Sequence, residues 1–233
     1  SAHGLTPDFR PVHTSPPQSR RRAKFSGRRT KKGAMIGFHA RASDVLVQVP
    51  DCQLVTPALL ATFPALEALT TIAASRKGEI ALTVTDTQGR PDVFIQTDQK
   101  LTPQLRIDLA VIAQQHRLAR LTWMDETIVT LEPPAQTFGA ATVVPPPGAF
   151  LQATQDGETA LLAAVQDIVL PAKNIVDLFA GAGTFALPLA KTAQVHAVEG
   201  EAAMIAALDA GWRKARNLHT VTSAARDLFR RPL

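Results

Sequence analysis

The sequence has 233 residues, of which 45% are hydrophobic and 19% are charged, and its formal net charge is +5 at pH 7. This composition is ordinary for a globular protein with one large core or two small ones. No apolar run approaches the roughly 18 residues that a membrane span needs, so we predict no membrane partner. The single cysteine excludes an internal disulfide, and without a recognisable targeting segment it predicts a cytoplasmic protein.

The positive charge is concentrated in residues 1–33, which contain nine Lys or Arg residues and one acidic residue. Few apolar side chains are available for burial there, which predicts a basic arm that is extended or loosely structured. Its cations, which include Arg20, Arg21, Arg22 and Lys24, are spaced closely enough to follow a phosphate backbone with salt-dependent affinity. A solvated, flexible arm without a ligand is the alternative interpretation.

Residues 34–136 are expected to form a small α+β domain. Thr102 and Pro103 predict the N-cap and first turn of a helix that ends near residue 115. Residues 57–74 predict an earlier helix that Pro64 kinks or restarts. Runs of strand-like composition predict strands at residues 45–49, 80–85, 93–96, 121–123 and 127–131, with a hairpin turn at residues 85–89. We recognise no catalytic constellation in this part of the sequence.

Prolines at residues 133–134 and 145–147 predict stiff, extended connectors into a second domain, residues 137–233. After an expected helix near residues 156–169, a short apolar strand ends in Asp177, and a small-residue turn contains Gly181 and Gly183. An apolar helical segment at residues 185–191 precedes a second strand that ends in Glu199. A further helix and strand are expected at residues 201–216 and 220–223. This order is that of the first half of a doubly wound nucleotide-binding fold.

The glycine turn predicts a ligand that contains a ribose. Glycines allow close backbone approach, a helix N-terminus offers free N–H groups, and an acid at the tip of the second strand can accept ribose hydroxyls. The spacing of Gly181, Gly183 and Ala186 is compatible with a dinucleotide fingerprint. Asp177, however, would bring negative charge near a pyrophosphate, whereas the sulfonium and amino groups of S-adenosylmethionine favour an acid. A methyl donor, a dinucleotide and an αβ unit without a ligand all stay open at this point.

Several of these segments resemble the class I RNA uracil-5-methyltransferases, the bacterial ribosomal and transfer RNA m5U enzymes. DLFAGAGTFALPLA followed by AVEG is similar to the cofactor motifs of that family, and residues 148–152 (GAFLQ) resemble its Phe-x-Gln motif. The basic run at residues 20–24, then Ile36-Gly37-Phe38 and Asp51-Cys52, resembles the family in order and spacing. The resemblance implies an α/β fold: a partial Rossmann-like class I methyltransferase domain, first strands only, after a small α+β domain and a basic N-terminal arm.

The turn and the resemblance together assign roles to individual residues. Contacts with S-adenosylmethionine are expected from Gln152, Asp177, Phe179, Gly181, Gly183, Thr184, Glu199 and Asp227. By resemblance, Glu199 contacts the ribose and Asp227 the adenine edge. Contacts with RNA are expected from Arg20, Arg21, Arg22, Lys24 and Phe150. The family commonly has Asn where this chain has Thr184, whose hydroxyl keeps only part of that hydrogen-bonding capacity.

Cys52 resembles the last of four cysteines that hold an iron–sulfur cluster in the ribosomal branch of the family. The other three are absent from this sequence, and a cluster takes about four thiolates, so a cluster is expected only in a longer parent protein. From its residue type alone, Cys52 is a small buried apolar residue. Cys52 makes ribosomal RNA the favoured partner over transfer RNA, and no protein partner is implied.

The resemblance implies catalytic elements that this sequence lacks: a nucleophilic Cys that attacks uracil C6, an Asp-Pro-Pro-Arg-like motif and a Glu that acts as a base. Uracil C5 needs that attack before it accepts a methyl group, so we expect an internal fragment that is inactive as given. The predicted parent activity is transfer of a methyl group from S-adenosylmethionine to C5 of a uridine in RNA. An NAD(P)-dependent oxidoreductase fragment and a non-catalytic RNA-binding module are the alternatives.

Overall fold

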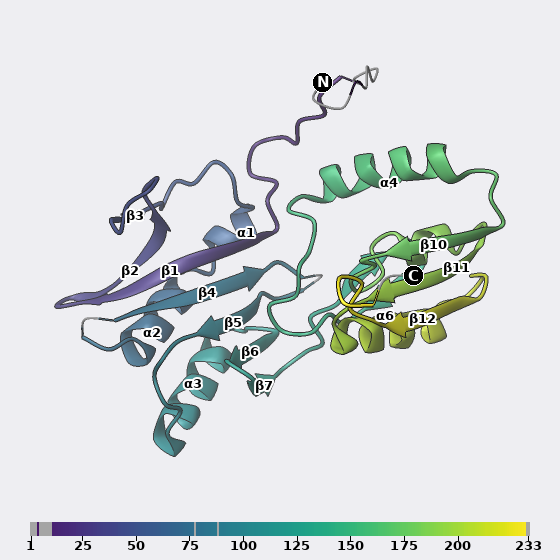
Figure 1. Cartoon of the computed structure of the whole chain (residues 1–233). Coiled ribbons are helices and arrows are strands. Elements are labelled where there is room, and N and C mark those ends of the chain that lie inside the picture. The colour runs from purple at the N-terminus through teal and green to yellow at the C-terminus, as the bar shows by residue number, and fades with distance from the viewer. Residues whose placement is uncertain (1–3, 5–10, 77, 88, 232–233) are drawn as a thin grey trace.

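The computed structural model describes residues 4, 11–76, 78–87 and 89–231, and its elements form two lobes (Figure 1). The first lobe contains a sheet and three helices: β1 (Arg22–Thr30), β2 (Gly33–His39), β3 (Leu46–Gln48), α1 (Pro57–Leu60), α2 (Phe63–Ala73), β4 (Glu79–Thr85), β5 (Asp92–Gln96), α3 (Pro103–Gln115), β6 (Arg120–Trp123) and β7 (Glu126–Thr130). The second lobe contains β8 (Gln136–Phe138), β9 (Ala141–Val143), α4 (Gln155–Val169), β10 (Asn174–Leu178), α5 (Ala186–Leu189), β11 (Gln194–Glu199), α6 (Ala202–Lys214) and β12 (Val221–Ala225).

The first lobe is a seven-stranded sheet in the order β3-β2-β1-β4-β5-β6-β7. Neighbouring strands are antiparallel except β5 and β6, which are parallel and joined through α3. Its core lies between the helices and one face of the sheet, where Phe25 of β1, Leu66 of α2 and Leu109 of α3 are fully buried. The sequence predicts the longer helices of this lobe closely. Pro64 lies in the first turn of α2, and at the start of α3 the Thr102 hydroxyl accepts the Leu105 N–H at 3.2 Å.

β1 corrects the prediction of a basic arm at residues 1–33. It pairs with both β2 and β4, so residues 22–33 belong to the same sheet as the strands that follow. The physical reason is alternation: Ala23 and Phe25 face the core while Lys24 is exposed, so one buried face suffices for a basic strand. β1 and β2 form an antiparallel pair over residues 26–37, between the basic run and Phe38. Residues 1–3 and 5–10 of the predicted arm lie outside the described residues.

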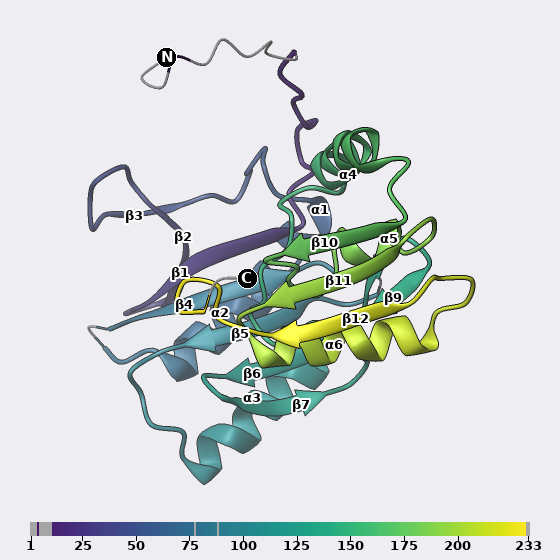
Figure 2. The same ribbon diagram turned by 45° about the vertical axis from the view of Figure 1, so that its right-hand side comes forward.

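The second lobe is a three-stranded parallel sheet in the order β10-β11-β12, with the helices α5 and α6 packed against it (Figure 2). Its core is separate from the first and includes Leu187, Val195 and Leu208. The predicted strand, glycine turn, strand and helix order is confirmed, although the segment at residues 185–191 contains only the short helix α5. The sequence analysis missed the β8–β9 hairpin between the two proline runs, in which Phe138 and Val143 are buried.

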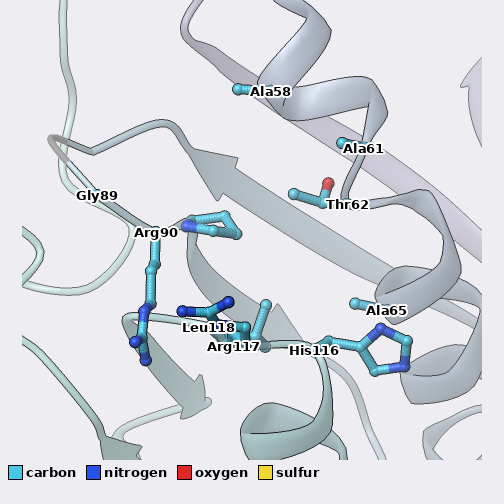
Figure 3. Close-up of a pocket in the computed structure, with 10 residues that line it drawn as sticks. Ala58, Ala61, Thr62, Ala65, Gly89, Arg90, His116, Arg117 and Leu118 are labelled. Carbon is cyan, nitrogen blue, oxygen red and sulfur yellow. The ribbon is translucent and has the colours of Figure 1, made fainter.

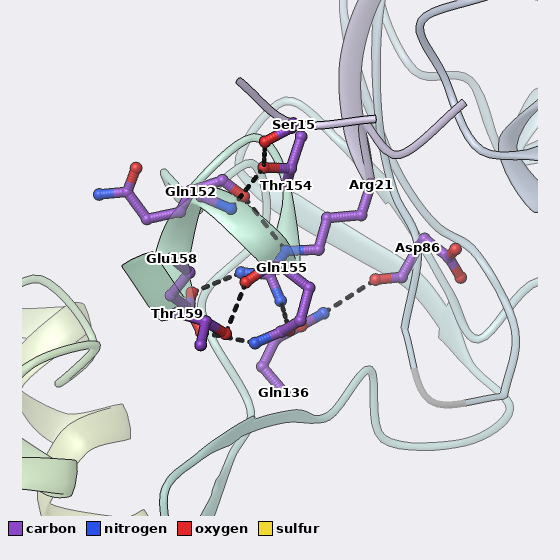
Figure 4. A network of polar contacts seen from close by, with 10 residues as sticks. Ser15, Arg21, Asp86, Gln136, Gln152, Thr154, Gln155, Glu158 and Thr159 are labelled. Atoms are coloured by element: carbon purple, nitrogen blue, oxygen red, sulfur yellow. Dashed lines mark hydrogen bonds and ion pairs between the residues drawn. The ribbon is translucent and has the colours of Figure 1, made fainter. Parts of the chain in front are cut away.

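Arg21, the residue before β1, joins the two lobes through a buried polar network (Figure 4). Its guanidinium donates to Glu158 Oε2 at 2.5 Å and to Gln155 Oε1, both on α4. Its Nε donates to Gln152 O at 3.1 Å, and its backbone N–H donates to Ala153 O at 2.8 Å. The side chains of Arg21 and Glu158 are only 10% and 7% exposed. The prediction that Arg21 contacts RNA is therefore wrong, because its charge is buried in a protein ion pair.

Two further contacts hold the connector between the lobes, residues 144–154, against the first sheet. Arg22 Nη2 donates to Gly148 O at 3.0 Å. Arg120 donates to both carboxylate oxygens of Asp92, at 2.9 and 2.7 Å, and to Pro145 O at 3.0 Å. The connector is thus fixed at residues 145, 148 and 152–153 by arginines of the first lobe.

We expect Arg21→Met to lower the free energy of unfolding by about 3–5 kcal/mol, because it leaves the Glu158 carboxylate buried without its partner. Arg106→Met is the matched control, since Arg106 pairs with Glu126 at an exposed position and should cost less than about 1 kcal/mol. Urea unfolding followed by circular dichroism measures both. The double variant Arg21→Met, Glu158→Met should recover most of the loss, and equal losses in the two single variants would contradict this account.

Candidate functional site

The turn between β10 and α5 has the backbone geometry of a ligand-binding loop. Phe179, Gly181 and Gly183 have φ values of 62°, 57° and 97°, in the left-handed region. A side chain at Gly183 would also lie 2.7 Å from Leu187, so this position requires glycine for packing. At Gly181 an added Cβ would meet nothing within 4 Å. Gly181 therefore leaves open space beside its backbone, as close approach of a ligand needs.

Glu199 closes this turn from the neighbouring strand. Its position at the end of β11 follows from the parallel register, in which Val198 pairs with Leu178 of β10. The Glu199 carboxylate accepts the Gly181 N–H at 2.9 Å through Oε2 and the Glu201 N–H at 3.0 Å through Oε1. Each oxygen keeps a lone pair for a further donor. The acid at the tip of the second strand thus lies where the sequence predicts it.

A cavity of about 320 Å³ lies between this turn and the connector. Its volume falls in the range of roughly 300–1,000 Å³ that is usual for small-molecule sites. Six of the predicted site residues line it: Phe150, Gln152, Phe179, Gly181, Thr184 and Glu199. The structure therefore brings together residues that lie up to 49 positions apart in the sequence (150 to 199).

Three predicted cofactor residues do not line the cavity: Asp177, Gly183 and Asp227. Gly183 acts through packing instead. The Asp227 carboxylate accepts the N–H groups of Phe229 and Arg230 at 3.0 and 3.2 Å, and so stabilises its own turn after β12. Phe229 of that turn contacts the ring of Phe179, with centroids 5.8 Å apart.

Sequence reasoning missed several residues that line the cavity, among them Phe185, Glu201 and Met204. Glu201 and Met204 lie at the start of α6, directly after Glu199. The sequence contains a signal for them: when a helix starts directly after a strand that ends in a site acid, the first turn of that helix also lines the site. With Glu199 and Glu201, the rim carries two carboxylates.

Asp177 is a half-buried acid beneath the glycine turn. The pKa of its carboxyl group is raised to about 6, chiefly by burial and also by the negative charge of Glu199, while a hydrogen bond from the backbone of Ala186 lowers it. Its Oδ2 atom has no hydrogen-bond partner among the described residues. An ionised Asp177 therefore adds uncompensated negative charge behind the cavity.

The residues predicted to contact RNA differ in accessibility. The side chains of Arg20 and Lys24 are exposed, whereas Arg22 is half-buried by its contact with the connector. Burial lowers the pKa of the Arg22 guanidinium. Phe150 is 69% exposed and lines the cavity, so its ring is available to a bound base. Arg20, Lys24 and Phe150 keep the predicted accessibility, and Arg21 does not.

Cys52 and the histidines form no metal site in the described part of the chain, where no group of three or more His, Cys, Asp or Glu could hold an ion. Cys52 is partly buried and packs against the core of the first lobe.

A separate cavity of about 420 Å³ lies beside the helices of the first lobe (Figure 3). Arg90, His116 and Arg117 line it together with alanines of α1 and α2, and Arg90 pairs with Glu132 at 3.3 Å. None of the predicted site residues lines this cavity.

Comparison with known proteins finds relatives that match almost the whole of this chain. An uncharacterized RNA methyltransferase of Rhizobium meliloti is 37% identical over 230 residues, which are 99% of this chain and 55% of that protein. Another from Mesorhizobium japonicum is 39% identical over 217 residues, 93% of this chain and 53% of that protein. The 23S rRNA (uracil(1939)-C(5))-methyltransferase RlmD of Vibrio campbellii is 33% identical over 199 residues, 80% of this chain and 44% of that protein.

The chain is homologous to RNA methyltransferases. It spans about half the length of the curated relatives it matches. The solved structure of the Pyrococcus abyssi tRNA (uracil-54, C5)-methyltransferase has the same fold, with a TM-score of 0.66 at 15% identity over 90% of this chain and 55% of that chain. The α/β methyltransferase-like fold is thereby confirmed. No family model matches the sequence, and no helix in the described residues has the length and apolar character of a membrane span.

We expect the stability of the protein to fall as pH rises through about 6, because Asp177 must then ionise while buried. The native pKa lies above the ordinary value of 3.8, so the native state binds more protons between these values and gains stability at the low end. The difference between the two pKa values, about 6 and 3.8, corresponds to a loss of at most about 3 kcal/mol in the free energy of unfolding. Asp177→Asn should remove this loss.

The measurement is the midpoint of thermal unfolding of the wild type and Asp177→Asn between pH 4 and pH 8. The gap between them should grow in favour of the variant as pH rises, while Asp125→Asn, at an exposed position, should leave the profile unchanged. A gap that does not vary with pH would rule out a buried, titrating Asp177.

Proposed function

We propose that this chain is the part of an enzyme that binds S-adenosylmethionine and faces RNA, in a parent protein that transfers a methyl group to C5 of a uridine. The observation that carries the proposal is the convergence of Gln152, Phe179, Gly181, Thr184 and Glu199 on one cavity. The homology to RNA methyltransferases supports it. The tRNA methyltransferase of similar fold was solved in complex with S-adenosyl-L-homocysteine, a product of the same cofactor class.

The residues present fit that cofactor. Glu199 has lone pairs free for ribose hydroxyls after accepting two backbone N–H groups. The carboxylates of Glu199, Glu201 and Asp177 create a negative potential that suits a cationic ligand. The backbone of Gln152 is fixed by Arg21 while its side chain points away from that network (Figure 4). When bound, the cofactor supplies an electrophilic methyl group, and the chain binds and orients it.

RNA is the proposed partner at the mouth of the cavity. Phe150 offers an exposed ring for stacking on a base, worth about 1–3 kcal/mol. Arg20 and Lys24 are exposed cations for the phosphate backbone. We propose ribosomal RNA over transfer RNA, which the likeness to the 23S rRNA enzyme supports. On this proposal residues up to about 136 face RNA, and residues 137–233 hold the cofactor in a cytoplasmic enzyme.

The chain alone should not complete the reaction. The resemblance implies a thiolate that attacks uracil C6, and the only cysteine in the sequence, Cys52, packs against the core of the first lobe instead of lining the cavity. A cluster does not fit this chain either, because a single thiol cannot supply about four thiolate ligands. A cluster ligand role for Cys52 applies only to a parent protein with further cysteines.

Two alternatives make different predictions. An NAD(P)-dependent oxidoreductase would place a pyrophosphate at the glycine turn, where Asp177 and Glu199 disfavour negative charge. A non-catalytic RNA-binding module would bind RNA but no adenosyl ligand. The cavity and its acids favour the methyltransferase.

Calorimetric titration with S-adenosylhomocysteine and, separately, with NAD tests the proposal. We expect the homocysteine compound to bind and NAD not to bind. Glu199→Ala should weaken binding by about tenfold or more, since it removes a charged hydrogen-bond acceptor.

Glu67→Ala, an exposed position on α2 outside the cavity, is the control and should bind like the wild type. The unfolding temperature of Glu199→Ala should be recorded alongside, because Glu199 also holds the turn. Binding of NAD in place of the homocysteine compound would refute the methyltransferase proposal.

A further inference from the structure

The β1–β2 turn carries a cluster of cations that the cofactor site does not explain. Arg29 lies near the end of β1, Lys31 and Lys32 form the turn, and Arg76 comes from the segment after α2. We call these four residues the basic tip. All four side chains are exposed. Arg29, Thr30, Lys31 and Arg76 are the described residues that line a hollow of about 610 Å³.

The charges of the basic tip are not neutralised within the described part of the chain. Arg28, the residue before Arg29, pairs with Glu79 at 2.8 Å, and His39 contacts the same carboxylate at 2.7 Å. None of the basic-tip side chains is in an ion pair with a described residue. Cations held together without acids repel one another. An anionic ligand would relieve that repulsion.

The position of the cluster argues against a simple protective role. Lysines that guard a sheet against aggregation lie on edge strands, whereas β1 has a neighbour on each side. The turn is also fixed in place, because the Thr30 hydroxyl accepts the Lys32 N–H at 3.3 Å. Arg29 additionally lines an adjoining hollow of about 500 Å³ together with Lys100. Asp108 also lines that hollow, so the surface beside the basic tip carries charges of both signs.

The chemistry of the hollow indicates phosphate groups. Its described lining contains guanidinium, ammonium and hydroxyl groups and no aromatic or aliphatic side chain. Such a surface suits a chain of phosphates bound by charge, with affinity that depends on salt. It does not suit an apolar ligand, which needs a pocket lined by hydrophobic side chains.

The distance from the cofactor cavity sets the size of the ligand. β1 starts at Arg22, which holds the connector beside the cavity, and ends at Thr30 in the basic tip. Eight residue steps at about 3.4 Å give a separation of roughly 27 Å along the strand. Both views place the β1–β2 turn on the side away from the second lobe (Figures 1 and 2). A stacked nucleic acid strand advances about 3.4 Å per nucleotide, so it spans this distance in about eight nucleotides.

We propose that the basic tip is a second RNA-binding site, which holds the phosphate backbone about eight nucleotides from the base at the cavity. This inference rests on the proposed function, because the first anchor is RNA at Phe150 and Lys24. The length of β1 then sets the shortest RNA that binds with full affinity, because the RNA must reach both ends of the strand.

Fluorescence anisotropy with single-stranded, uridine-containing RNAs of 6 and 20 nucleotides tests the proposal. The triple variant Arg29→Gln, Lys31→Gln, Arg76→Gln should bind the 20-mer about tenfold or more weakly, and the slope of log affinity against log salt should fall by about 2. Binding of the 6-mer should stay unchanged. The matched control Arg213→Gln, Lys214→Gln, Arg216→Gln, with the same charge change at exposed positions in or near the end of α6, should behave like the wild type.

Equal losses in the two triple variants would overturn the proposal, since only net charge would then matter. If the basic-tip variant lost affinity for the 6-mer and the 20-mer alike, the predicted dependence on RNA length would be wrong. Full displacement of the 20-mer from the basic tip by polyglutamate at matched charge would identify an acidic protein as the partner and overturn an RNA site. Titration with S-adenosylhomocysteine separates this result from the proposed function: length-dependent RNA binding without homocysteine binding refutes the cofactor site and supports the basic tip.

Discussion

The buried ion pair between Arg21 and Glu158 is the constraint on which the candidate site depends. Removing two charges from water is costly, and the cost is offset only when the geometry is good and the remaining donors are satisfied. Here Gln155 and the carbonyl of Gln152 accept two further hydrogen bonds from the guanidinium. Together with the ion pair, these bonds hold α4 against the start of β1. They also fix the backbone of Gln152, a residue that lines the cavity.

The same logic explains why so many acids surround the glycine turn. Asp177 and Glu199 lie at the ends of adjacent parallel strands, so the fold itself brings their charges together. The turn satisfies Glu199 with two N–H groups but leaves one oxygen of Asp177 without a partner among the described residues. An arrangement that raises the pKa of an acid stores unfavourable electrostatic energy, which a positively charged ligand lowers. On the proposed function, that ligand is the cationic S-adenosylmethionine.

Local signals in the sequence were enough to predict several elements of both lobes. Thr102 with Pro103, and the strand, glycine turn and acid around Gly181, depend on neighbours in sequence, and the structure has them in place. Arg21 could not be read in this way, because an arginine in a basic run has the same local pattern whether it meets phosphate or Glu158, 137 positions away. The β8–β9 hairpin was missed because prolines on both sides obscured two three-residue strands. For Asp227 the local pattern leaves two roles open, since an acid after a strand can serve a ligand or its own turn. In the structure it accepts the N–H groups of its own turn, and its contact with the cofactor stays a prediction.

β1 connects these observations mechanically. Arg21, just before β1, and Arg22, its first residue, hold the connector. Phe25 in the middle of the strand packs in the first core, and Arg29 near its end belongs to the basic tip. One strand thus reaches from the connector beside the cavity to the basic tip. The two lobes have separate cores. Any coupling between an RNA on the first lobe and a cofactor in the second would therefore depend on the polar contacts between the lobes. These are the contacts of Arg21 and Arg22 with the connector and with α4, of Arg120 with Pro145, and of Gln136 with Asp86.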